Sequence, residues 1–101
     1  MTYIMFLGLN DQSAKIQLVS TEDAKKTVSD YCAHELGFAT ISEASGVYTH
    51  ENGTTVQETT LQIKVSGCTE EQIREAANFF KATFNQESIG LLSIPYDIGL
   101  I

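Results

Sequence analysis

The side chains that could do chemistry in this chain gather around one turn. Tyr48 and His50 precede an Asn-Gly pair, and Glu58 follows it. A histidine beside a carboxylate can act as an acid–base pair or grip a polar ligand. We predict that these three residues lie together near the turn end of a hairpin and bind a ligand. The alternative is that His50 is a solvated residue beside the turn and Glu58 an ordinary polar strand position. Since no third group joins them, no catalytic residue is predicted.

Two further candidate ligand-binding residues lie elsewhere in the chain. Asn10 begins a polar loop after the first predicted strand, where α/β folds often hold ligands, and Lys64 could neutralise an anion. Each has a simpler interpretation, as a solvated loop residue and as an ordinary surface charge. The two cysteines, Cys32 and Cys68, lack the spacing of a metal or redox motif. We therefore predict no metal site and no cofactor.

The stretch 38–67 predicts the hairpin that must position the first group. Two runs rich in β-branched residues flank the Asn-Gly pair, which is a strong hairpin signal. A two-residue turn would put the apolar residues of the two strands on opposite faces. A three-residue turn over 51–53 with Gly53 left-handed, or a bulge at Gly46, puts them on one face. The residues expected to face the core are Ile41, Val47, Leu61, Ile63 and Val65. The residues expected on the opposite face are Tyr48, His50, Val56, Glu58 and Lys64.

The segments around the hairpin read as two strands and two helices. Residues 2–9 are apolar on both strand faces, which favours a central strand. A helix is predicted from residue 20 or 21 to 36, with Gly37 as its stop. A second helix begins at Thr69, whose capping box with Gln72 marks its start, and ends at 85–86. Residues 88–94 are predicted to form the last strand.

Each predicted helix carries an apolar stripe at helical spacing, and these stripes should meet the sheet. The first stripe is Ala24, Val28, Tyr31, Cys32 and Glu35 or Leu36. The second is Ile73, Ala76, Ala77, Phe79, Phe80 and Phe84.

The order strand, helix, strand, strand, helix, strand is typical of an α+β ferredoxin-like fold. We predict a four-stranded antiparallel sheet with both helices on one face, in one domain spanning 1–101. The first strand carries Tyr3, Met5 and Leu7 on one face and Ile4 and Phe6 on the other, and helices on one face would leave one of these two sets in water. We therefore predict a homo-oligomer formed through the open sheet face, the sheet edges or the apolar tail 95–101.

The composition and net charge of the chain indicate which classes of partner it is unsuited to bind. The net charge of −7 argues against a nucleic acid polymer or an anionic membrane surface, because both reward clusters of lysine and arginine. The apolar start has no basic residue before it, so we interpret it as a strand rather than a signal peptide, and no stretch has the length of a membrane span. A cytoplasmic protein is the expectation.

Three segments carry a resemblance to known sequences. Residues 3–11, 46–53 and 84–89 resemble a group of short, uncharacterised proteins of bacteria and their phages. The resemblance implies a small cytoplasmic protein of bacterial or phage origin, but it transfers no functional residue. At the level of the fold, the chain is similar to dimeric α/β-barrel proteins and to trimeric nucleotide sensors of the PII type, a fold that hosts unrelated functions.

These observations favour binding over catalysis. The leading hypothesis is a non-enzymatic oligomer that holds a small, nucleotide-like molecule near Tyr48, His50 and Glu58. In a phage, its role would be to sequester a host signal or counter a host defence. The alternatives are a small dimeric-barrel enzyme with His50 or Glu58 as general base, and a protein-binding inhibitor that acts through its acidic surface.

Overall fold

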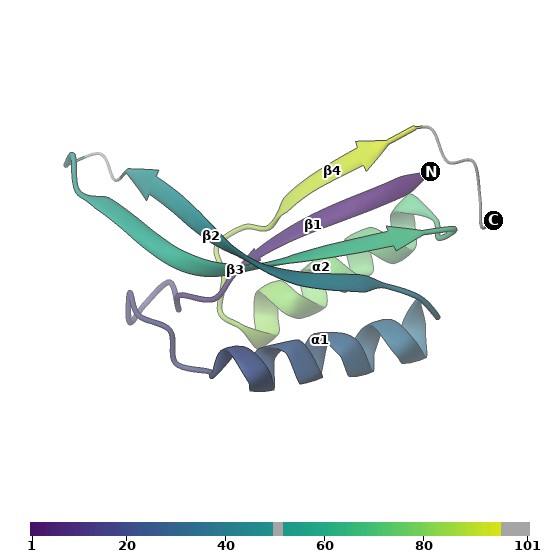
Figure 1. Cartoon of the computed structure of the whole chain (residues 1–101), viewed down its shortest axis with the longest axis horizontal. Helices are drawn as coiled ribbons and strands as arrows, with labels where there is room; N and C mark the ends of the chain where they lie inside the picture. Colours follow the sequence, from purple (N-terminus) through teal and green to yellow (C-terminus); the bar gives the residue numbers. More distant parts are fainter. Residues whose placement is uncertain (50–51, 96–101) are drawn as a thin grey trace.

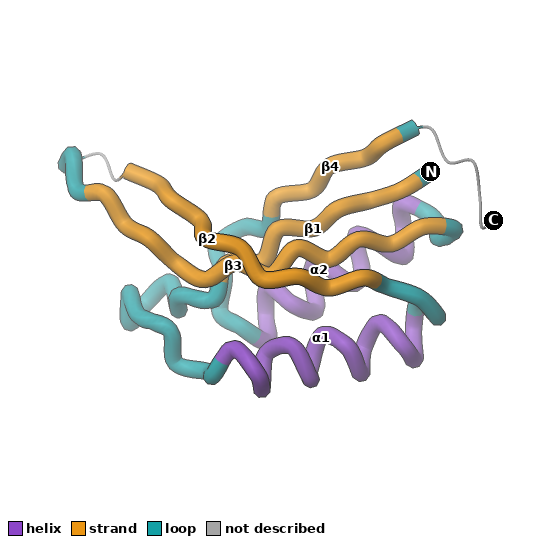
Figure 2. Tube along the Cα trace, in the orientation of Figure 1, coloured by secondary structure: helices purple, strands orange, loops and turns teal. Residues whose placement is uncertain are grey.

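The protein forms a four-stranded antiparallel sheet covered on one face by two helices (Figures 1 and 2). A computed structural model describes residues 1–49 and 52–95. Along the chain the elements are β1 (Thr2–Gly8), α1 (Thr21–Glu35), β2 (Thr40–Thr49), β3 (Thr55–Ser66), α2 (Glu70–Thr83) and β4 (Gly90–Ile94). The strand order is β2-β3-β1-β4, so β1 and β3 are central. The ferredoxin-like prediction is confirmed.

The helix ends follow the predicted chemistry. Ser20 caps α1, because its hydroxyl accepts a hydrogen bond from the Asp23 N–H at 3.1 Å. Thr69 and Gln72 form the predicted capping box at the start of α2. Gly37, with φ 78°, takes the left-handed conformation that ends α1. None of the described helices has both the length and the apolar character that crossing a membrane requires.

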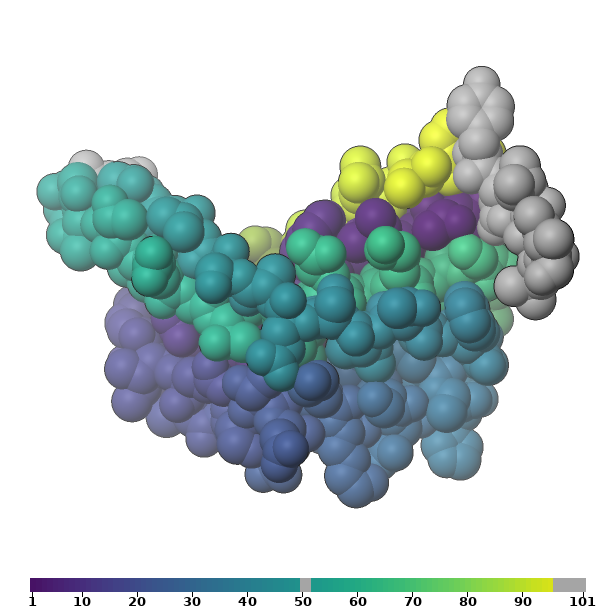
Figure 3. Space-filling model, viewed as in Figure 1, coloured from purple at the N-terminus to yellow at the C-terminus, as the bar shows by residue number. Residues whose placement is uncertain are grey.

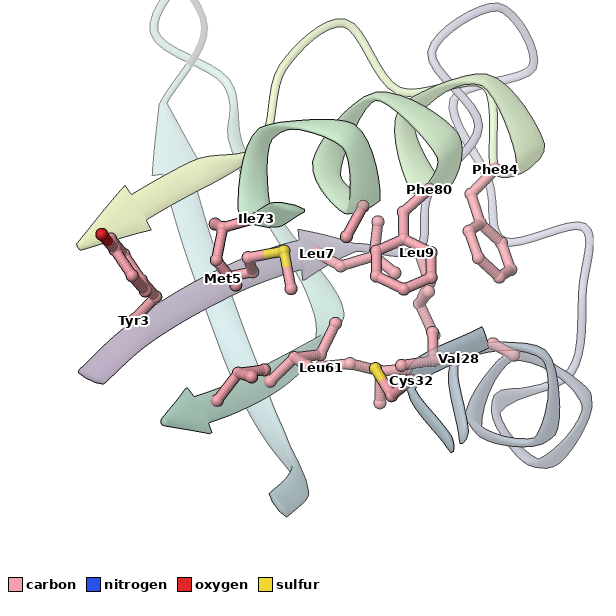
Figure 4. Close-up of a cluster of buried hydrophobic side chains, with 14 residues drawn as sticks. Tyr3, Met5, Leu7, Leu9, Val28, Cys32, Leu61, Ile73, Phe80 and Phe84 are labelled. Atoms are coloured by element: carbon pink, nitrogen blue, oxygen red, sulfur yellow. The ribbon is translucent and has the colours of Figure 1, made fainter. Parts of the chain in front are cut away.

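The core lies between the sheet and the helices (Figure 4). Alternate residues of β1 point into it, and Phe80 of α2 is completely buried against them. Burying such a side chain contributes roughly 1.5–3 kcal/mol. The buried core residues are Tyr3, Met5, Leu7, Leu9, Ala24, Val28, Cys32, Leu61, Ile63, Val65, Ile73, Ala76, Phe80 and Phe84.

The pairing of β2 with β3 has the register that a three-residue turn requires. Ile41 faces Ile63, and the ladder runs to Thr49 opposite Thr55. Gly53 has φ 87°, as the left-handed turn position demands. The described residues of the two strands therefore lie on the faces that the three-residue turn predicts. His50 and Glu51, the first residue of the predicted turn, lie outside the described residues.

The far half of this hairpin is an arm that extends past the helices (Figures 1 and 3). The molecule is accordingly 45 Å long but 25 Å and 23 Å across. Val47 lies on the predicted face, yet its side chain is 61% exposed. The prediction that Val47 is buried was wrong, because the arm has no helix beneath it to pack against.

Three other expectations also need correction. Glu35 of α1 and Phe79 of α2 are exposed at the edges of their stripes, so Leu36 rather than Glu35 packs against the core. Phe79 stacks on Tyr31 instead, with ring centroids 4.6 Å apart. The last strand begins at Gly90, two residues later than expected, because residues 88 and 89 still belong to the loop that follows α2.

The second face of the sheet has no helix over it (Figure 1). Ile4 and Phe6 of β1 are half-buried there, and β4 adds Leu92 opposite Ile4 and Ile94 opposite Thr2. Leu92 is 48% exposed. We call these four apolar side chains, Ile4, Phe6, Leu92 and Ile94, the open-face stripe.

Candidate functional site

A hollow of about 470 Å³ lies on the open sheet face, where the arm leaves the body of the molecule. Figure 3 shows the molecule hollowed between the arm and β4. Small-molecule sites typically enclose roughly 300–1,000 Å³, so the open-face hollow has room for a nucleoside-sized ligand. Its described lining is Phe6, Gly8, Asn10, Asp11, Gln12, Lys15, Tyr48, Glu58, Thr60, Gln86, Glu87 and Ser88.

Two glycines make room for the floor of the hollow. A Cβ on Gly8 would lie 2.7 Å from Cδ and 2.8 Å from Oε2 of Glu58. A Cβ on Gly46 would lie 2.6 Å from the hydroxyl of Thr60. Side chains of β3 therefore lie directly over the neighbouring backbone, and only glycine at these two positions lets Glu58 and Thr60 lie there.

The carboxylate of Glu58 is fixed from a second side. Its Oε2 accepts a hydrogen bond of 3.0 Å from the backbone N–H of Asn10. A charged acceptor makes such a bond roughly twice as strong as one between neutral groups. Between Gly8 and Asn10, the carboxylate of a flexible side chain is thus held in one place on the floor of the hollow.

The loop after β1 is held by the end of α2. Asn85, in the left-handed conformation at φ 48°, donates from Nδ2 to Oδ2 of Asp11 at 3.0 Å and accepts at its carbonyl from the Gln12 N–H. Asp11 also accepts from the N–H groups of Ser13 and Ala14. These bonds, with that from Ala14 the largest, lower the pKa of the Asp11 carboxyl below its usual value. The Asp11 carboxylate therefore holds the loop in its conformation by accepting hydrogen bonds from within the loop and from Asn85.

The charges around the hollow do not balance. Asp11, Glu58 and Glu87 contribute carboxylates to its described lining, and Lys15 contributes the single described ammonium group. Because potentials add within a concave surface, the hollow favours a cationic or neutral ligand over an anionic one. A phosphorylated nucleotide is therefore a poor match for the charge of this lining.

The structure brings three of the five predicted ligand-binding residues together. Tyr48, Glu58 and Asn10 all line the hollow, although Glu58 lies at the base of the arm rather than near its turn. Lys64 shares the open face but lies opposite Ile4, roughly 20 Å along β3 from Glu58 at about 3.3 Å per residue. His50 lies outside the described residues.

The ligand-binding residues predicted from the sequence include only three of the twelve residues in the described lining. Phe6 was predicted only as part of one of the two apolar faces of the first strand, Gln86 was assigned to the end of a helix, and Glu87 was given no role. A signal for them was available in the resemblance, since all three of its segments contribute to the hollow. Segment 46–53 contributes Tyr48, segment 84–89 contributes residues 86–88, and segment 3–11 contributes Phe6, Gly8, Asn10 and Asp11.

Among residues 1–49 and 52–95, no cluster of three or more histidine, cysteine or acidic side chains could hold a metal ion. The cysteines lie on the helix side of the sheet, away from the hollow. Burial raises the pKa of the Cys32 thiol to about 11, with a smaller contribution from Cys68. A thiol of that kind is a packing group rather than a nucleophile.

Comparison with known proteins places this geometry in context. No protein-family profile matches the chain, and no curated protein sequence matches it. Among solved structures, the chain is similar to a phage SAM lyase in complex with S-methyl-5′-thioadenosine. The two are 25% identical, with a TM-score of 0.64 over 89% of this chain and 76% of that one.

The fold also occurs in proteins of more distant sequence. The divalent cation tolerance protein CutA of Archaeoglobus fulgidus is 14% identical, with a TM-score of 0.64 over 99% of this chain and 88% of that one. Its counterpart from Thermus thermophilus is 15% identical, with a TM-score of 0.61 over 96% and 87%. These two likenesses support the ferredoxin-like fold alone.

Proposed function

We propose that the open-face hollow binds S-adenosylmethionine (SAM) and releases 5′-methylthioadenosine from it. The observation that carries the proposal is the carboxylate of Glu58, fixed between Gly8 and Asn10 on the floor of a hollow that is net negative. SAM carries a sulfonium and an ammonium group, so this charge suits it. Similarity to a phage SAM lyase over 89% of the chain supports the same choice.

The proposed reaction balances without a co-reactant. The bond between the sulfonium sulfur and the terminal carbon of the amino-acid chain breaks, and its electron pair goes to sulfur, which becomes a neutral thioether. The carbon then gains either a bond from the substrate's own carboxylate oxygen, closing a lactone, or a double bond as the Glu58 carboxylate or a water molecule takes the neighbouring proton. In the first case positive and negative charges cancel in the transition state, so partial exclusion of water would speed the step.

In the lactone-forming route Glu58 acts by binding rather than by proton transfer. A carboxylate beside the sulfonium stabilises the substrate more than the transition state, because the sulfonium charge disappears. A carboxylate beside the ammonium group stabilises both, because that charge persists. In either position Glu58 distinguishes the cationic substrate from 5′-methylthioadenosine, which carries neither charge. Tyr48 and Phe6 supply aromatic surface beside it, suited to the purine ring.

The experiment incubates the purified protein with SAM and measures 5′-methylthioadenosine and the four-carbon product by mass spectrometry and NMR. Formation of 5′-methylthioadenosine supports the lyase, and the NMR spectrum tells a lactone from an alkene. Binding of SAM without product would replace the lyase with the sequestering module expected from the sequence. Absence of both would overturn the proposal and favour the protein-binding inhibitor.

Glu58→Gln tests the site within the same assay. We expect the affinity for SAM to fall about tenfold, the effect of losing roughly 1.4 kcal/mol of charge interaction, while that for 5′-methylthioadenosine changes less than about twofold. Glu71→Gln is the matched control, since Glu71 is exposed on α2. Equal losses of affinity for SAM and for 5′-methylthioadenosine would show that Glu58 shapes the hollow and does not distinguish a cationic ligand from a neutral one.

Self-association belongs to the same proposal. The open-face stripe borders the hollow, and a second copy laid over it would remove these side chains and the bound substrate from water. Native mass spectrometry of the wild type and of Leu92→Glu tests this. We expect an oligomer for the wild type and a monomer for the variant, because a buried charge opposes association. A monomeric wild type would refute the proposed self-association.

In a phage, consumption of SAM would act on host processes that need SAM.

A further inference from the structure

The side chain of Gln86 connects the end of α2 to the floor of the hollow. Its Nε2 lies 2.6 Å from the carbonyl oxygen of Asn10 and 3.2 Å from that of Phe84. A primary amide has two N–H donors, so each hydrogen meets one carbonyl. One of these carbonyls belongs to the helix end, where backbone oxygens lack a partner within the helix. Gln86 therefore ties the loop after β1 to a rigid element.

Asn10 is held on both sides of its Cα. Its carbonyl accepts from Gln86, and its N–H donates to Oε2 of Glu58 at 3.0 Å. These two bonds constrain both backbone torsions of Asn10, because each fixes one of the flanking peptide planes. The peptide between Asn10 and Asp11 is also held within the loop, because the Asp11 N–H donates to the Ile16 carbonyl at 2.8 Å. The bond from Gln86 adds an anchor from this peptide to the end of α2, and so helps to set the direction of the N–H that holds the Glu58 carboxylate.

We propose that Gln86 is a positioning residue that sets the Glu58 carboxylate through the backbone of Asn10. This inference rests on the proposed function only for its consequence, which is that Gln86 controls the affinity for the cationic substrate. The geometry itself is present without ligand. Gln86 also lines the hollow, but its donors are already engaged with Asn10 and Phe84, so its effect on charge passes through Glu58.

The loop has a second attachment that a change at Gln86 would leave in place. Asn85 holds Asp11 by a 3.0 Å hydrogen bond and Gln12 through the backbone. The Gln86 N–H donates to the Lys81 carbonyl whatever its side chain is. A variant without the amide should therefore fold and keep the loop near its position, with the Asp11 N–H still bonded to the Ile16 carbonyl, and lose the anchor of the Asn10 carbonyl to the end of α2.

The test uses Gln86→Met, which keeps the length and neutrality of the side chain and removes both donors. Gln57→Met is the matched control, because Gln57 is exposed on the opposite face of β3, next to Glu58 in sequence. Gln86→Lys restores an N–H donor of similar reach. Each variant is examined by NMR without ligand, and its affinities for SAM and 5′-methylthioadenosine are measured by calorimetry.

We expect Gln86→Met to move the Asn10 amide proton upfield and to speed its exchange with solvent about tenfold, the scale of one lost charge-assisted bond. Affinity for SAM should fall about five- to tenfold, and affinity for 5′-methylthioadenosine by less than about twofold. Gln57→Met should match the wild type, and Gln86→Lys should recover the amide signal.

An unchanged Asn10 amide in Gln86→Met would overturn the inference. Equal losses of affinity for both ligands, together with a lower free energy of unfolding, would also overturn it, because they would show a structural role alone. A wild type that binds neither ligand would refute the proposed function, while the Asn10 amide would still decide whether Gln86 positions Glu58.

Discussion

The two faces of the sheet are built from the same strands for different purposes. On the covered face, Met5 and Leu7 of β1 pack with no exposed surface against the helices. On the open face, their neighbours Phe6 and Gly8 border a hollow, and Gly8 has no side chain because Glu58 occupies that space. The comparison shows how alternation along one strand separates stability from recognition: large apolar residues fill the covered side, and on the open side Gly8 leaves the space that the Glu58 carboxylate occupies.

If the covered face carries the stability, Phe80→Ala should have the largest effect. Phe80 is completely buried, and removing such a ring leaves a cavity that costs about 3–5 kcal/mol. Chemical denaturation measures the free energy of unfolding. The adjacent Phe79, which is 42% exposed and stacked on Tyr31, gives a matched control for which Phe79→Ala should cost about 1 kcal/mol. Similar losses in both variants would remove the distinction between core and surface.

The covered face should also respond to alkaline pH through Cys32. Its thiol has a pKa of about 11 in the folded protein, above the ordinary value of 9.0, because burial disfavours the thiolate. A raised folded pKa adds stability below the unfolded pKa, and this contribution is lost as pH rises through the folded value. We therefore expect the free energy of unfolding to fall by about 2–3 kcal/mol between pH 9 and pH 11.

Cys32→Val provides the control for this pH effect, since valine is apolar and has no proton to lose. Its free energy of unfolding should decline less over the same range. The difference between the two curves isolates Cys32 from the lysines and tyrosines, which titrate in both proteins. Parallel curves would show that the thiol ionises without unfolding the protein.

The covered face was largely predictable from the sequence, and the hollow was not. The apolar character of both faces of β1, which predicts a central strand, and the four–three–four spacing of Ile73, Ala77, Phe80 and Phe84, which defines one helical face, are local patterns. The capping box at Thr69 and the turn at Gly53 are equally local. These patterns gave the element order, the central strands and the hairpin register.

The hollow depends on contacts between distant segments. Glu58 meets Asn10 across 48 residues, and Gln86 meets Asn10 across 76. No periodicity connects such positions, so Gln86 looked like a helix end. The exposure of Val47 had the same cause, because the length of the arm relative to the helices appears only when both are placed.

The smallest effect on stability, with a large effect on binding, is expected for Gly8→Ala. The new methyl group would displace the flexible end of Glu58, and alanine restricts the unfolded chain, so the free energy of unfolding should change by less than about 1 kcal/mol. The carboxylate would nevertheless leave the Asn10 N–H, and SAM affinity measured by calorimetry should fall at least about tenfold. Gly90→Ala is the control on the same face, since its Cβ would meet Phe6 at an ordinary 3.4 Å. If Gly8→Ala instead unfolded the protein while Gly90→Ala did not, Gly8 would be required for folding. The open face would then contribute to stability as well as to binding, which would contradict the proposed difference between the two faces.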